Sequence, residues 1–278
     1  MTVHRTLRHL VAAPAATALL ALPALVQPSA GSVPAVEAVQ GPALRVAAWT
    51  PVLRDEFNRA NPGGSKWNSG RAGVDITSCG ATRPDPSQPG DRVLRVFPQP
   101  FATCRITSTD AFGGDGRTYK LSARVKVPTS RGHYTSFWTN SRSGAYDEID
   151  VFESYGRFRP GQYLTCGGGA VARNTTRFRG MQSMVYLDDD PKTGRAHCWT
   201  PRQLERLHPF DGAWHTYTAV WNPGESVTFS VDGRRVAQFG PRYAVPSQID
   251  LRLTDIDNNN SERNAQSLKV DWVKVWRR

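Results

Sequence analysis

The chain has few cysteines, few histidines and no internal repeat, and each shortage removes a class of protein. Its 278 residues include 4 Cys and 6 His, with no Cys-x-x-Cys pair and no histidine spacing suited to a metal. Neither a Gly-x-Ser-x-Gly motif nor a phosphate-binding loop is present. Hydrophobic residues make up 39% and charged residues 21%, an ordinary globular composition that excludes disordered, collagen-like and coiled-coil chains.

Long apolar runs are also scarce, and the one that stands out lies at the N-terminus. Two arginines precede an Ala- and Leu-rich run from 11 to 26, and small residues and prolines follow it. This order is typical of a secretory signal, with cleavage after Ala30 or Ala38. A lone membrane anchor is the alternative, but the run is short for a span of about 20 residues. We therefore predict a signal peptide and linker over 1–38, and a single secreted domain over 39–278.

The four cysteines all lie in the predicted mature part and indicate an oxidising compartment. They are widely spaced, which disfavours a zinc site, and their number allows three disulfide pairings. Strands that are adjacent in sequence usually lie side by side, which favours two disulfides, Cys79 with Cys104 and Cys166 with Cys198.

Basic residues exceed acidic residues by 35 to 24, which gives a formal net charge of +11. The excess is scattered along the chain. It is typical of a solvated basic surface, or of attraction to an anionic polymer or cell wall. No recognition motif for nucleic acid accompanies the charge, so we expect no nucleic-acid partner.

The mature part has strand character, and no helical period is sustained over three turns. From 118 to 127 apolar and polar residues alternate, which predicts a half-buried strand. A second alternating run over 226–231 reaches Asp232-Gly233 and resumes at Val236, which predicts a tight hairpin.

Two more strands are expected at 214–221 and at 268–276, the latter with apolar residues on both faces. Residues 80–90 and 156–210 are rich in Gly, Pro, Arg and Asp. We expect them to be long loops, the second with short strands inside it. Many short antiparallel strands around one core favour an all-β, two-sheet jelly roll.

Four acids fall within the seven residues from Asp147 to Glu153, in a stretch that otherwise has strand character. On a regular strand Glu148 and Asp150 share a face and Glu153 points the opposite way, because side chains alternate. A one-residue bulge between Asp150 and Glu153 brings all three acids to one face, and bulges are common beside active sites. We therefore predict such a bulge if the cluster is catalytic.

With the bulge, the two glutamates lie about four strand steps apart, roughly 13 Å between Cα atoms. Side chains that lean together bring their carboxyls toward the separation of about 5–5.5 Å used by retaining glycosidases. Crowded acids do not all ionise easily, so at least one pKa should rise, as a proton donor near neutral pH requires. The alternative is an exposed strand face with solvated acids, or a calcium-binding patch.

Aromatic side chains near the acids favour a sugar-binding role, because flat rings stack on sugar rings. Trp138 and Tyr155 are the candidates nearest the acids, and Trp67 and Trp199 are two more. A core position is the alternative for each tryptophan.

The segment Glu148-Ile-Asp150-Val-Phe-Glu153 resembles the signature of glycoside hydrolase family 16, in the longer, bulged form of laminarinases, β-agarases and carrageenases. The resemblance extends over most of residues 50–276. Further matching segments are Asp55-Glu56-Phe57, Ser65-Lys66-Trp67, 119–128, Ser136-Phe137-Trp138, Trp214-His215-Thr216-Tyr217, Val231-Asp232-Gly233 and 270–275.

This resemblance implies a concanavalin-like jelly roll whose concave sheet forms an open cleft. It also implies endo-hydrolysis of a β-linked polysaccharide with retention. Glu148 matches the nucleophile, Glu153 the acid/base and Asp150 the carboxylate that assists the nucleophile. Trp138 matches an aromatic residue beside the scissile bond.

The resemblance leaves the substrate open, because a histidine common after the signature is replaced here by Tyr163-Leu-Thr-Cys166. A β-1,3-glucan and a galactan such as agar are the two alternatives. We expect an extracellular monomer that requires no cofactor and does not bind a membrane after signal cleavage. Family members often hold a structural calcium ion on the sheet opposite the cleft, for which Asp271 and Glu56 are candidates. The rival interpretation is a non-catalytic, lectin-like protein on the same scaffold.

Overall fold

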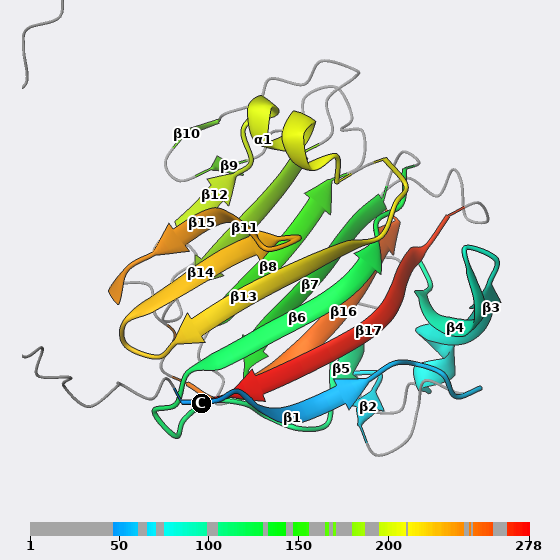
Figure 1. Cartoon of the computed structure of the whole chain (residues 1–278), viewed down its shortest axis with the longest axis horizontal. Helices are drawn as coiled ribbons and strands as arrows, with labels where there is room; N and C mark the ends of the chain where they lie inside the picture. Colours follow the sequence, from blue (N-terminus) through cyan, green and yellow to red (C-terminus); the bar gives the residue numbers. More distant parts are fainter. Residues whose placement is uncertain are drawn as a thin grey trace, which may run out of the picture. The chain divides into compact units, whose positions relative to one another are not determined.

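Two antiparallel β-sheets account for most of the described part of the chain in the computed structural model (Figure 1). Each strand forms where apolar residues recur with the two-residue period of extended chain. The structure describes residues 47–60, 66–70, 75–98, 105–129, 133–142, 147–155, 165–166, 169–170, 180–186, 195–209, 211–241, 245, 247–257 and 266–278.

The first sheet, the β6 sheet, has eight strands in the described ranges, in the order β15-β14-β13-β6-β17-β4-β3, and β1 also pairs with β17. Burial alternates along its strands: Leu121 and Val125 of β6 are fully buried, whereas Lys120 and Arg124 are partly exposed. The strands are β1 (Thr50–Asp55), β3 (Gly80–Asp85), β4 (Gln88–Val96), β6 (Tyr119–Lys126), β13 (His215–Asn222), β14 (Ser226–Val231), β15 (Arg234–Phe239) and β17 (Leu268–Arg277).

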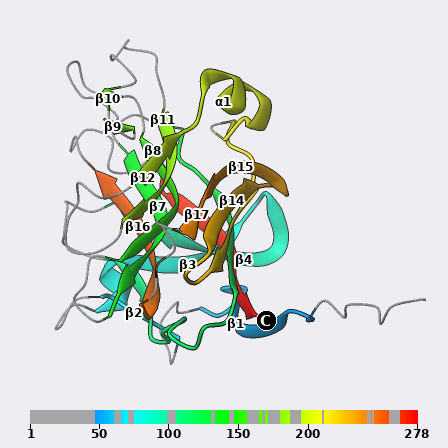
Figure 2. The ribbon, with the colours of Figure 1, turned by 90° about the vertical axis from the view of Figure 1, so that its left-hand side faces the viewer.

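The second sheet, the β8 sheet, has seven strands within the described residues, in the order β12-β11-β8-β7-β16-β5-β2. Figure 2 shows its strands as a layer separate from those of the β6 sheet. The strands are β2 (Trp67–Asn68), β5 (Ile106–Ser108), β7 (His133–Ser141), β8 (Glu148–Tyr155), β11 (Gly180–Tyr186), β12 (Arg195–Cys198) and β16 (Ile249–Asp257).

Short elements complete the described part of the chain. Strands β9 (Thr165–Cys166) and β10 (Gly169–Ala170) pair with each other, and a 3-10 turn spans Ile76–Ser78. The helix α1 (Pro201–Leu207) begins with a capping box, in which Thr200 and Gln203 each accept a bond from the other's backbone N–H. Its seven residues agree with the prediction that no helical period extends over three turns.

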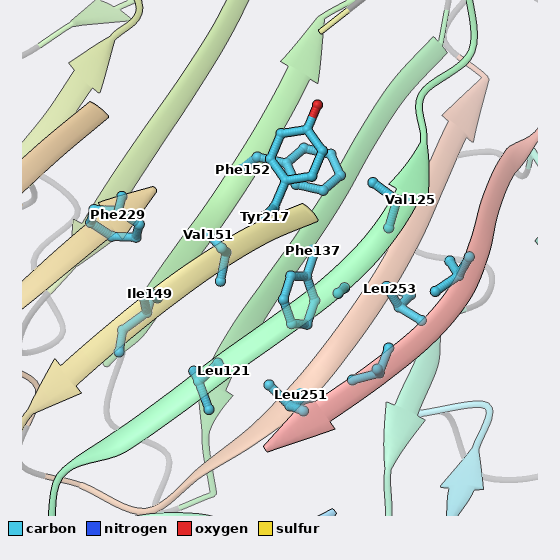
Figure 3. Close-up of a cluster of buried hydrophobic side chains, with 14 of the residues drawn as sticks. Leu121, Val125, Phe137, Ile149, Val151, Phe152, Tyr217, Phe229, Leu251 and Leu253 are labelled. Carbon is cyan, nitrogen blue, oxygen red and sulfur yellow. The ribbon is translucent and has the colours of Figure 1, made fainter. Parts of the chain in front are cut away.

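The hydrophobic core lies between the two sheets. Phe152 of β8 packs against Tyr217 of β13, with ring centroids 4.3 Å apart, and both side chains are fully buried. Figure 3 shows this pair with Phe137, Leu251 and Leu253, which project from the β8 sheet into the same layer. One face of each sheet is therefore fixed as its core face, and the opposite face is called its outer face below.

The strands predicted over 118–127 and 268–276 and the predicted hairpin are confirmed. Residues 118–127 and 268–276 correspond to β6 and β17, which pair with each other. Strands β14 and β15 form the predicted hairpin, and Asp232 and Gly233 adopt positive φ angles of 47° and 75°. Such angles suit Asp-Gly in a two-residue turn, because the turn's twist then matches that of the strands.

The two predicted long loops are wrong in part. Residues 80–90 belong to the β3–β4 hairpin, whose turn is closed by bonds from the N–H and hydroxyl of Ser87 to the Asp85 carboxylate. Residues 156–210 contain the expected short strands, but also β11, which pairs with β8. A polar residue interrupts the apolar pattern that would have predicted this strand. Ser183 faces the core, and its hydroxyl donates to the Val151 carbonyl at 3.0 Å.

All of the described residues belong to one compact unit, which ends at Arg278. The predicted signal peptide and linker over 1–38 lies outside the described residues. Within those residues, no helix has both the length and the apolar character needed to cross a bilayer.

Replacing Phe152 by alanine should lower the free energy of unfolding by about 3–5 kcal/mol, because the ring is fully buried between the sheets. Urea unfolding followed by tryptophan fluorescence measures the loss. Val220→Ala, at a partly exposed position of β13, is the control and should cost about 1 kcal/mol or less. Equal losses for both variants would contradict the inward position of Phe152.

Candidate active site

A bulge in β8 determines which way the three acids of the signature face. Relative to β7, the register of β8 shifts by one residue at Val151. Relative to β11, it shifts at the same place. Both shifts fall between Asp150 and Glu153, so the bulge predicted from the sequence is confirmed.

The bulge turns two successive side chains, Val151 and Phe152, into the core. Both are at most 2% exposed, and Figure 3 shows them among the core residues. Alternation resumes after the extra residue, so the acids before and after it point the same way. Glu148, Asp150 and Glu153 therefore all lie on the outer face of the β8 sheet.

Asp150 is fully buried beside Glu148, and this position raises its pKa. No N–H or O–H donor in the described part of the chain reaches its carboxyl oxygens, and its hydrogen-bonding partner is the Glu148 carboxyl. Burial raises the pKa of Asp150 well above its ordinary value, and the charge of Glu148 and the bond to it raise the pKa further. Asp150 is therefore the donor in this pair.

Glu148 is partly exposed, and its surroundings favour the charged form more than those of Asp150 do. Burial raises the pKa of Glu148, whereas the bond from Asp150, the charge of Arg252 and a bond from Asn140 oppose the rise. The charge of Arg105 acts in the same direction. The pKa of Glu148 is thus raised by burial, but the neighbouring cations and hydrogen-bond donors oppose this rise, which they do not do at Asp150.

Trp138 lies on the same outer face, where it is paired with Asp150 across β7 and β8. Its indole N–H donates to Thr254 Oγ1 at 2.8 Å. The guanidinium groups of Arg252 and Arg105 lie 4.9 and 5.5 Å from its ring centroid. Cation–π attraction and the indole bond together fix this ring beside the acids.

Glu153 is 5% exposed and is held by two donors that the sequence analysis missed. The Tyr134 hydroxyl donates to Oε1, and Gln182 Nε2 donates to Oε2 at 2.5 Å. Tyr134 lies four residues before Trp138 on β7, so alternation alone puts both on one face. Gln182 lies on β11, inside the range expected to be a loop, where no signal was recognised.

Two of the predicted sugar-binding tryptophans are core residues, which corrects those assignments. Trp67 is 2% exposed, and its indole N–H donates to Asp55 Oδ2 at 2.8 Å. Trp199 is 3% exposed and stacks on Tyr217. Burial of large aromatic rings dominates core energetics, and the local sequence does not reveal which face of a strand they occupy.

Tyr155 and three of the cysteines lie wholly or partly outside the described part of the chain. The backbone of Tyr155 pairs with β7 and β11, but its side chain is not described. Cys79 is buried and disulfide-bonded. Cys104 lies outside the described residues, as do the side chains of Cys166 and Cys198, so the two pairings stay predictions.

The two carboxylates named as calcium candidates are both in ion pairs. Asp271 lies 2.6 Å from Arg124, and Glu56 lies 3.0 Å from Lys274. Both carboxylates thus already face a cationic side chain, and a structural calcium ion stays a prediction. No cluster of three or more metal-binding side chains occurs among the described residues.

Comparison with known proteins identifies the family to which this chain belongs. The model of the glycosyl hydrolases of family 16 matches residues 104–274, and the chain belongs to this family. The family predicted from the signature is therefore confirmed. A search of curated protein sequences finds no match.

Solved structures of glycoside hydrolases share the two-sheet fold at low sequence identity. The laminarinase from Rhodothermus marinus is 16% identical, with a TM-score of 0.58 over 84% of this chain and 98% of its own. Porphyranase B from Zobellia galactanivorans is 13% identical, with a TM-score of 0.57 over 82% and 92%. β-Agarase A from the same organism is 17% identical, with a TM-score of 0.54 over 82% and 92%. These likenesses confirm the predicted jelly-roll fold.

The buried acid predicts an unusual pH dependence of stability. An unfolded Asp ionises near pH 3.9, whereas folded Asp150 keeps its proton to a much higher pH. Between the two pKa values the folded state loses about 1.4 kcal/mol per pH unit relative to the unfolded chain. Asp150→Asn, which retains a donor toward Glu148, should therefore be more stable than the wild type at pH 7 and similar to it below about pH 4.

Urea unfolding at pH 3.5 and pH 7 measures this difference. Asp91→Asn, at an exposed position of β4, is the control and should follow the wild type at both values. An Asp150→Asn variant that is less stable than the wild type at pH 7 would show that Asp150 is ionised in the folded protein.

Proposed function

We propose that this protein is a secreted, endo-acting, retaining β-glycosidase that cleaves a β-linked polysaccharide by double displacement. The bulge at Val151 carries the proposal, because it places Glu148, Asp150 and Glu153 on one face. A retaining mechanism requires two carboxyls on the same sugar linkage, one to attack and one to transfer the proton.

Glu148 is the proposed nucleophile. Arg252, Arg105 and the proton of Asp150 all favour its charged form. Attack on the anomeric carbon turns the Glu148 carboxylate into an ester and breaks the glycosidic bond. When water later cleaves the ester, the Asp150 proton stabilises the departing carboxylate through the bond that exists in the free protein.

Glu153 is the proposed acid and base. Its carboxyl protonates the oxygen of the leaving sugar in the first step and takes a proton from the attacking water in the second. Tyr134 and Gln182 each bond one of its oxygens, which keeps the carboxyl oriented through both steps.

The position of β8 suits endo action on a long polymer. β8 is the third of seven described strands, with β11 and β12 on one side and β7 and β16 on the other. A polymer that lies across the sheet therefore meets protein on both sides of the acids. Trp138 offers a ring for stacking, and Arg252 and Arg105 beside it offer donors to sugar hydroxyls.

A β-1,3-glucan or a galactan such as agar is the proposed substrate. Structures of a laminarinase and of a β-agarase, both similar to this chain in fold, support the two alternatives equally. Secretion is proposed from the N-terminal signal pattern, and the active form is proposed to be a monomer that requires no cofactor.

Glu148→Gln and Glu153→Gln should each lower the rate of polysaccharide cleavage by about 10²–10⁴-fold, because each removes a group that takes part in bond breaking. Reducing-end release from laminarin, mixed-linkage glucan, agarose and carrageenan measures the rate and identifies the polymer. Glu205→Gln is the control. Glu205 is exposed on α1, so its substitution should leave the rate unchanged.

Proton NMR of the first products tests retention, which predicts that the β-anomer forms first. Formation of the α-anomer first would overturn the double displacement. Binding of a polymer that is never cleaved, and that survives both substitutions, would favour the lectin-like interpretation instead.

A further inference from the structure

A cavity of about 420 Å³ opens on the β6 sheet. Its walls come from β4, β6 and β17 and from the segments just before β13 and β17. The acids of the candidate active site lie on the other sheet, so this cavity is separate from them. The lining residues are Arg95, Lys126, Val127, Pro128, Thr129, Asp211, Gly212, Gln266, Ser267 and Lys269.

Three cations form one row across the floor of the cavity. Lys269 of β17 is paired directly with Arg95 of β4 on one side and with Lys126 of β6 on the other. Residues paired in this way point to the same face, here the outer face. Like charges directly opposite each other destabilise a sheet, so the row calls for negative charge nearby.

Among the described residues, only the middle cation, Lys269, has a carboxylate partner. Lys269 Nζ lies 2.6 Å from Asp85 Oδ2, and this ion pair and bonds from Ser87 hold the Asp85 pKa below its ordinary value in spite of burial. Within the described residues, Arg95 and Lys126 have no ion pair. The Nε atom of Arg95 is buried and has no acceptor.

The acidic residue in the wall does not fill this gap. Asp211 Oδ1 accepts from the Ala213 N–H at 2.7 Å and faces His215 Nε2 at 3.3 Å. Burial raises the Asp211 pKa, but these two bonds lower it more, so the carboxylate is charged and engaged by its own loop. Arg95 and Lys126 thus remain without a negative partner on the floor.

We propose that this cavity is a second sugar-binding site, which takes a sugar unit that bears an oxyanion, either a sulfate ester or a carboxylate. The oxyanion lies over Arg95 and Lys126, because bonds between charged donors and oxyanions are the strongest of their kind. Cavities of about 300–1,000 Å³ hold small molecules, so there is room for the ring as well as for its charged group.

The walls also carry groups suited to a sugar. Ser267 and the Thr129–Gln266 pair offer polar groups to hydroxyls, and the largely buried Val127 and Pro128 contribute apolar atoms to the wall. The occupant inferred is therefore an anionic polysaccharide, which the formal net charge of +11 also attracts.

Calorimetric titration with galactose 6-sulfate and with glucuronate, at low ionic strength, tests the site and distinguishes its two oxyanions. Each measurement uses the Glu148→Gln/Glu153→Gln protein, so that no probe is turned over. Binding of either probe is expected, whereas galactose should not bind. Lys126→Gln should weaken binding by about tenfold or more, and Lys126→Arg, which keeps the charge, should retain it.

Arg83→Gln removes the same charge at an exposed position of β3 outside the cavity, and it should leave the affinity unchanged. Equal weakening by Lys126→Gln and Arg83→Gln would overturn the site, because the probe would then respond to overall charge. Absence of binding by both anionic probes would also overturn it, as would equally tight binding of a single-stranded oligonucleotide. None of these outcomes bears on cleavage by the wild-type protein, which tests the proposed function separately.

Discussion

Two neighbouring residues of one strand cannot both face the core unless the strand carries an extra residue between its partners, and this constraint organises the site. Val151 and Phe152 are both buried, and the register shifts against both β7 and β11 show that the extra residue is absorbed there. The contact of Phe152 with Tyr217 joins the two sheets. The apolar core thus holds the bulge in place, and the bulge in turn sets the direction of the acids.

The same strand carries a cost in electrostatic free energy. A buried carboxyl with no N–H or O–H donor among the described residues is destabilising unless it stays protonated, and Asp150 meets this condition by sharing a proton with Glu148. Arg252, held by Asp250 at 2.8 Å, and Arg105 bring positive charge to the pair. A pair of carboxyls that keeps one proton between them is poorly suited to stability alone, but it suits chemistry in which one carboxylate alternates between ester and anion.

The sequence was informative where a single period or motif decides the structure. Alternation predicted β6, apolar residues on both faces predicted β17, Asp-Gly predicted the hairpin turn, and the spacing of the acids predicted the bulge. The sequence did not predict residues whose place in the site depends on how several strands pair. Arg252 lies between the buried Leu251 and Leu253, an alternation that went unrecognised, and Gln182 lies on a strand interrupted by an inward serine. Trp67 and Trp199 were misplaced because an indole beside polar residues suits a sugar site and a core equally well.

The outer face of the β6 sheet carries ion-paired cations, whereas the outer face of the β8 sheet carries buried carboxyls. On the β6 sheet, three cations of the central strands form ion pairs with carboxylates: Arg124 with Asp271, Lys274 with Glu56 and Lys269 with Asp85. Buried polar groups in folded proteins normally have partners, so the exceptions mark places where a ligand completes the structure. Arg95 Nε is such an exception on the β6 sheet, whereas on the β8 sheet the Asp150 carboxyl has the neighbouring Glu148 carboxyl as its one partner among the described residues. The guanidinium suits holding an anionic unit, whereas a buried carboxyl with a raised pKa suits chemistry that involves a proton.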